Sequence, residues 1–120
     1  MILKINSKKQ NILELLDSLE FGMLDYMKYG NENYNETDVK LCMTIMNSYL
    51  SKISVSKSKI EGMRIVKNTV MDLNVLNQKC NGKLIETDQR EQICPIIILA
   101  AYEKGYNRIN EDITEEFREW

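Results

Sequence analysis

The most apolar stretch of the chain runs from Ile93 to Tyr102 (ICPIIILAAY) and contains no charged side chain. Its ten residues are too few to cross a bilayer, since a membrane-spanning helix needs about 20. A capping pair, Asp88 and Glu91, precedes the run, and Lys104 with Gly105 follows it, as is typical of the two ends of a helix. The run therefore predicts a helix buried at the centre of a protein core, and we expect no membrane partner.

Pro95 lies near the start of this apolar run. A proline inside a helix removes one hydrogen bond, and its ring presses on the carbonyl four residues earlier, here that of Glu91. The predicted central helix therefore either bends at Pro95 or begins there.

Three further segments carry apolar residues at spacings of three and four, the pattern of an amphipathic helix. Capping boxes formed by Ser7 with Gln10 and by Ser58 with Glu61 mark the starts of two of them. The predicted limits of the three helices are Ser7 to Gly30, Thr37 or Asp38 to Ser54, and Ser58 to Asn81.

A last capping pair, Asp112 with Glu115, predicts a short C-terminal helix that ends on Phe117 and Trp120. The loops between the predicted helices are short, so consecutive helices are expected to be antiparallel neighbours. The fold class predicted from the sequence is all-α: a single domain over residues 1–120, built as a compact bundle of four main helices plus a short C-terminal helix.

The third predicted helix has a second group of apolar residues, Ile60, Met71 and Val75, about half a turn from its main apolar face. Either this helix is covered on two sides, or it presents an apolar strip that a partner binds. The sequence leaves both alternatives open.

The residue types that are missing restrict the chemistry. The chain contains no histidine, which removes the commonest general base and most protein zinc sites. Its three cysteines, Cys42, Cys80 and Cys94, are scattered among apolar residues and suit buried thiols in a reducing compartment. There is no glycine-rich phosphate loop and no signal-peptide core at the N-terminus. We therefore expect a cytoplasmic protein with no cofactor, no metal and no catalytic residue.

Two carboxylate clusters remain as candidates for magnesium chemistry. The segment Glu115 to Glu119 (EEFRE) resembles the first acidic motif of the all-helical nucleoside triphosphate pyrophosphohydrolases, a resemblance that covers five residues. That family also has a downstream Glu-x-x-Asp, whereas the Glu-x-x-Asp of this chain, Glu14 to Asp17, lies upstream. The second cluster, Glu86, Asp88 and Glu91, lies at the predicted start of the central helix, where negative charge stabilises the helix without a metal.

Charge is unevenly distributed along the chain, although its net charge is only −2. Residues 52–67 carry an excess of four positive charges, and residues 111–120 carry an excess of four negative charges. The two segments either meet within the molecule, pair between molecules or attract a partner of opposite charge. Because the positive excess is small and no recognition motif accompanies it, nucleic acid is the less favoured partner.

Tyrosines and asparagines are concentrated where the first predicted helix ends, and tyrosine is enriched in protein interfaces. The predicted partner-binding residues are Tyr26, Tyr29, Asn31, Asn33, Tyr34, Glu111, Asp112, Glu115, Glu116 and Glu119. The sequence thus predicts a non-catalytic protein-binding module, as an inhibitor or an immunity-protein or antitoxin-like protein for a basic partner, with a homo-oligomer as a further option. The alternatives are a metal-dependent pyrophosphohydrolase-like enzyme and a weak nucleic-acid-binding protein.

Overall fold

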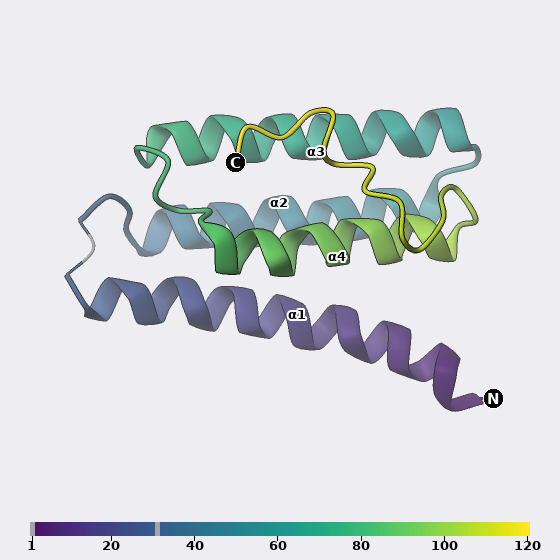
Figure 1. Ribbon diagram of the computed structural model, residues 1–120, viewed down its shortest axis with the longest axis horizontal. Helices are drawn as coiled ribbons and strands as arrows, with labels where there is room; N and C mark the ends of the chain where they lie inside the picture. Colours follow the sequence, from purple (N-terminus) through teal and green to yellow (C-terminus); the bar gives the residue numbers. More distant parts are fainter. Residues whose placement is uncertain (1, 31) are drawn as a thin grey trace.

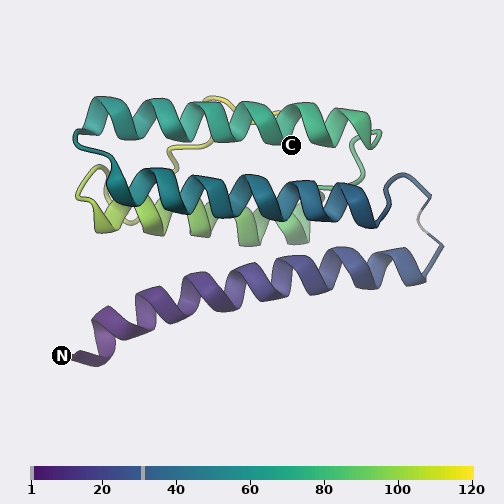
Figure 2. The same ribbon diagram turned by 180° about the vertical axis from the view of Figure 1, so that it is seen from behind.

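The computed structural model describes residues 2–30 and 32–120, with side chains from residue 11 onward except residue 31. It contains four helices: α1 (Ile2–Lys28), α2 (Glu36–Val55), α3 (Lys59–Lys79) and α4 (Thr87–Glu103). Consecutive helices run in opposite directions, and α2 and α4 lie between α1 and α3 (Figures 1 and 2). The described ranges contain no strand, so the predicted all-helical bundle is confirmed. None of their helices is long and apolar enough to span a membrane.

The core is built around α4, as the apolar run predicts. Ile93, Ile96 and Ile97 are 0% exposed, and they meet apolar side chains from α1, α2 and α3. The hydroxyl of Tyr49 in α2 donates a hydrogen bond to the carbonyl oxygen of Ile97 at 2.7 Å, and burial raises the pKa of this tyrosine. Pro95 lies inside α4, so the helix does not begin there.

The start of α4 differs from the sequence prediction. Its N-cap is Glu86, not Asp88, and the Glu86 backbone N–H donates to Gln89 Oε1 at 3.1 Å. The reason lies in α3, where Asn77 Oδ1 accepts hydrogen bonds from the backbone N–H groups of Leu84 at 3.1 Å and Ile85 at 2.8 Å. This contact holds the connecting segment in a fixed turn, and the helix begins as soon as that turn ends.

The other helix ends are set by local chemistry. Asn35 caps α2 in a capping box with Asp38, so α2 begins at Glu36 and not at Thr37 or Asp38. Ser58 caps α3 as predicted and accepts from the Glu61 backbone N–H at 3.2 Å. The helical backbone of α1 begins at Ile2, before the predicted start. The side chains of the predicted capping pair at positions 7 and 10 lie outside the described residues.

The predicted C-terminal helix is wrong. Residues 113–117 form turns, with the backbone N–H groups of Phe117 and Arg118 both donating to the Thr114 carbonyl oxygen at 3.0 Å. The chain then bonds to α3 instead of continuing as a helix. Asn74 Nδ2 donates to the Phe117 carbonyl oxygen at 2.8 Å, and the Glu119 backbone N–H donates to Asn74 Oδ1 at 3.0 Å. Residues 105–120 therefore run across the α3 and α4 side of the bundle (Figure 1).

Candidate partner-binding surfaces

The predicted tyrosine and asparagine cluster is only partly a surface. Tyr26 and Tyr29 are 42% and 83% exposed, whereas Tyr34 is 6% exposed and its hydroxyl donates to the Met23 carbonyl oxygen at 2.7 Å. Burial, followed by the nearby charge of Glu86, raises the pKa of Tyr34 to about 12. Tyr34 therefore packs inside the bundle, and its prediction as a partner-binding residue is wrong.

The two predicted asparagines have different outcomes. The side chain of Asn33 is exposed, and its Oδ1 accepts a hydrogen bond from Asn81 Nδ2 at 3.2 Å, which links the first loop to the end of α3. Asn31 lies outside the described residues. Asn33 is therefore part of the surface, and its hydrogen bond with Asn81 holds it in place.

Tyr26 lies at an acidic hollow between the C-terminal half of α1 and the first turns of α4. The hollow has a volume of about 480 Å³. Its lining is Gly22, Asp25, Tyr26, Asp88, Gln89, Glu91 and Gln92. We call it the Tyr26 hollow. It combines three carboxylates with an aromatic ring, and no basic side chain lines it.

The helix positions explain why the Tyr26 hollow is acidic. Stepped at about 100° per residue, Asp88 and Gln92 lie on the side of α4 that faces α1, and Arg90 lies on the opposite side. Arg90 instead contributes its charge near Cys94, on the side of α4 that residues 105–120 cover. The amino end of α4 carries its own partial positive charge, which stabilises the carboxylates there in the absence of a partner.

Such a hollow fits a lysine or arginine side chain from another molecule. Carboxylates accept hydrogen bonds from ammonium or guanidinium groups, and a tyrosine ring attracts a cation that lies over its face. Gln92 also lines the hollow, and its Oε1 is buried without a hydrogen-bond partner among the described residues. Asp25 is not among the residues predicted from the sequence, because its proximity to Asp88 and Glu91 depends on the packing of the end of α1 beside the start of α4.

Most of the predicted acidic C-terminal residues bond within their own segment or to α3. Asp112 forms an ion pair with Arg118 at 2.9 Å, and Glu111 Oε1 accepts from the Arg108 backbone N–H at 3.0 Å. Burial alone would raise the pKa of Asp112, but hydrogen bonds from Thr114 and Arg118 outweigh it and hold that pKa below its ordinary value.

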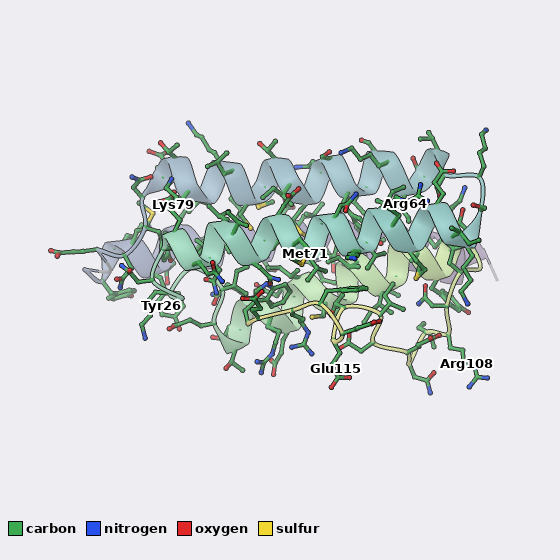
Figure 3. The ribbon with its side chains drawn as sticks, turned by 90° about the horizontal axis from the view of Figure 1, so that it is seen from above. Tyr26, Arg64, Met71, Lys79, Arg108 and Glu115 are labelled. Atoms are coloured by element: carbon green, nitrogen blue, oxygen red, sulfur yellow. The ribbon has the colours of Figure 1, made fainter. Side chains whose placement is uncertain are left out.

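Glu119, the last of these acidic residues, accepts a hydrogen bond from Gln78 Nε2 at 2.8 Å. Glu115 and Glu116 are exposed and face outward from the segment, as Figure 3 shows for Glu115. The acidic surface of the C-terminal segment therefore consists mainly of these two glutamates.

The structure does not assemble the acidic motif that resembles the pyrophosphohydrolases. That resemblance needs Glu115 and Glu119 on one face of a helix, whereas the segment forms turns and Glu119 is bonded to α3. Within the described ranges, no group of three or more cysteine, aspartate and glutamate side chains lies close enough to hold a metal ion. Glu86, in the second cluster, forms a long ion pair with Lys83 at 3.8 Å.

The second apolar group of α3 is a surface. Ile60, Met71 and Val75 are 76%, 41% and 66% exposed, so the alternative of a helix covered on two sides is wrong (Figure 3). The basic residues nearby do not pair with the acidic C-terminal segment, because no ion pair among the described residues joins them. Instead, Lys67 Nζ lies over the Phe117 ring, 5.7 Å from its centroid.

The three cysteines are free and buried, as the sequence predicts. Burial raises the pKa of the Cys42 thiol to about 12, and it also raises the pKa of Cys94. Reactive cysteines have lowered pKa values and some exposure, so neither thiol has the character of a nucleophile.

Comparison of the chain with protein-family models, with curated proteins and with solved structures finds no match.

Proposed function

We propose that this chain is a non-catalytic protein-binding module that binds a basic protein through the Tyr26 hollow. The observation that carries the proposal is the meeting of Tyr26 with Asp25, Asp88 and Glu91 in one open hollow that no basic side chain lines. A large aromatic ring that is 42% exposed beside three carboxylates provides both contact area and charge for a lysine or arginine of the partner.

The finer form of the proposal is an inhibitory role similar to that of immunity proteins and antitoxins. A small acidic domain sequesters a basic enzyme efficiently because opposite charges steer the two proteins together and exclude partners of the wrong sign. Glu115 and Glu116 extend the acidic surface on the C-terminal segment. The same distribution of charge makes nucleic acid a poor ligand for this side of the molecule.

The test begins with capture of the partner from the native source, followed by binding measurements with purified components. In the hollow variant, Asp25→Asn, Asp88→Asn and Glu91→Gln remove three charges and keep the side-chain shapes. Each exposed charge pair contributes up to about 1 kcal/mol, so we expect the hollow variant to bind roughly 10- to 100-fold more weakly.

The matched control is the double variant Glu115→Gln and Glu116→Gln, which removes exposed carboxylates outside the hollow. We expect it to lower the affinity by less than about threefold, because distant exposed charges act mainly by screened steering. A partner that binds the hollow variant as tightly as the unmodified protein would refute the proposed site. A partner with an acidic or apolar contact surface would refute the proposed chemistry.

A further inference from the structure

The outward face of α3 combines apolar and basic side chains in a regular order. Ile60, Arg64, Lys67 and Met71 follow one another at spacings of four, three and four, and Val75 continues the row. Stepped at about 100° per residue, these positions lie within one narrow strip. All five side chains are exposed, and Figure 3 looks down on this side of the molecule. We call this strip the α3 outer face.

One flank of α1 has the same order with the opposite charge. Leu13, Asp17, Glu20 and Leu24 follow one another at the same spacings of four, three and four. Leu13 is 55% exposed, Leu24 is partly buried, and Phe21 beside the row is 68% exposed. We call this strip, with Phe21, the α1 outer face. No lysine or arginine occurs in residues 11–27.

The two strips match in register as well as in charge. A row with spacings of four, three and four reads the same in both directions, so it aligns with its counterpart whether the helices run parallel or antiparallel. In either case apolar side chains meet apolar side chains at the ends, and Arg64 and Lys67 meet Asp17 and Glu20 in the middle.

The two outer faces cannot meet within one molecule. The helices α2 and α4 lie between α1 and α3 (Figures 1 and 2). The α3 strip lies opposite the buried side of its helix, whereas the α1 strip lies on a flank, where Leu13 borders a groove lined by residues of α2 and α4. The contact is therefore available only between separate copies of the chain. Each copy has one strip of each kind, on two different helices.

We propose that this chain self-associates head to tail, with the α1 outer face of one copy packed on the α3 outer face of the next. The contact removes Ile60, Met71 and Phe21 from water and pairs the charged centres of the strips. It is heterologous, so a bound pair still exposes one free strip of each kind and adds further copies. Neither strip includes the Tyr26 hollow, so the inference does not depend on the proposed function.

The test uses two charge-reversed variants. Variant A carries Arg64→Glu and Lys67→Glu on the α3 outer face, and variant B carries Asp17→Lys and Glu20→Lys on the α1 outer face. Sedimentation of the unmodified protein from micromolar to millimolar concentration is expected to show progressive association that weakens as salt rises. Variants A and B alone are expected to be monomers.

An equimolar mixture of A and B decides the geometry. Variant A keeps an acidic α1 outer face and variant B keeps a basic α3 outer face, so they form one native contact. The two reversed strips also match each other, because the α3 outer face of A is now acidic and the α1 outer face of B is now basic. They form a second contact with the charges exchanged. The mixture is therefore expected to associate, whereas neither variant does so alone.

If variant B associates alone, the contact is a symmetric one between two α3 outer faces. If variant A associates alone, the contact is a symmetric one between two α1 outer faces. Each of these two results overturns the proposal. A monomeric unmodified protein throughout this range, or a mixture that remains monomeric, also overturns it. Circular dichroism checks that each variant is folded, and Arg64→Gln with Lys67→Gln replaces variant A if reversal unfolds it. Lys40→Glu with Lys52→Glu, on exposed positions of α2, is the matched control and is expected to associate like the unmodified protein.

Discussion

Replacing Asn77 with alanine is expected to destabilise the whole bundle. One atom, Asn77 Oδ1, accepts hydrogen bonds from the backbone N–H groups of both Leu84 and Ile85, and all three residues are at most 6% exposed. Each buried N–H group left without a partner costs about 1–3 kcal/mol, and alanine returns about 0.5 kcal/mol through its higher helix propensity. The free energy of unfolding is therefore expected to fall by about 3 kcal/mol.

The measurement is urea unfolding followed by circular dichroism. With a urea dependence of about 1–3 kcal/mol per molar for a domain of this size, the loss corresponds to a midpoint lower by roughly 1.5 M. The matched control is Asn77→Asp, which keeps an acceptor oxygen in the same place and is expected to lose less stability. A loss below about 1 kcal/mol for the alanine variant would show that these hydrogen bonds do not hold the start of α4.

Three further substitutions test other parts of the structure. Burial opposes ionisation of Asp38, but its hydrogen bonds outweigh burial and lower its pKa. The ionised carboxylate therefore stabilises the fold above a pH of about 4, and this stabilisation is lost as the pH falls through the lowered pKa. In unfolding measurements, Asp38→Asn should cost about 1–2 kcal/mol at pH 7 and little near pH 2. Asn74→Ala removes the hydrogen bonds of Asn74 to the Phe117 carbonyl oxygen and the Glu119 backbone N–H, which leaves the Gln78 bond to Glu119 in place. A shift in the fluorescence of Trp120 at an almost unchanged unfolding midpoint should report the loosening of the C-terminal segment. A Cβ at Gly62 would collide with the Tyr106 ring. Gly62→Ala should therefore lower the unfolding free energy by about 1–2 kcal/mol, although alanine has the better helix propensity. Unchanged stability would contradict the close packing of Gly62 against Tyr106.

The sequence predicts the four helices because their signals are local. Apolar spacing of three and four, the Ser58 cap and the glycines after α1 and α3 depend on neighbouring residues alone. The uncharged run from 93 to 102 likewise identifies the buried helix without knowledge of its neighbours. These features survive in the folded structure because no distant contact competes with them.

The errors at the start of α4 and in the C-terminal segment occur where a distant side chain competes with a local signal. Asn77 moves the start of α4 from Asp88 to Glu86, and Asn74 bonds to the segment that the Asp112 cap would otherwise start as a helix. Tyr34 illustrates the same limit, because a tyrosine in a polar loop has no local sign that its hydroxyl reaches a carbonyl of α1.

The candidate site was predictable only in part. Tyr26 follows from the tyrosine cluster, and Asp88 and Glu91 form a visible acidic pair, but their meeting with Asp25 requires knowing that α1 and α4 are antiparallel neighbours. The exposure of Ile60 was also undecidable from the sequence, because a helix with two apolar sides gives no indication of which side is covered.

The salt dependence of partner binding distinguishes a contact at the Tyr26 hollow from a contact elsewhere on the surface. With the captured partner, the dissociation constant is measured from about 50 to 500 mM salt for the unmodified protein and for the variant with Asp25→Asn, Asp88→Asn and Glu91→Gln. Binding through the Tyr26 hollow predicts a dissociation constant that rises steeply with salt for the unmodified protein and much less for the variant, because the variant lacks the screened charges. Equal salt dependence for the two proteins would contradict the account.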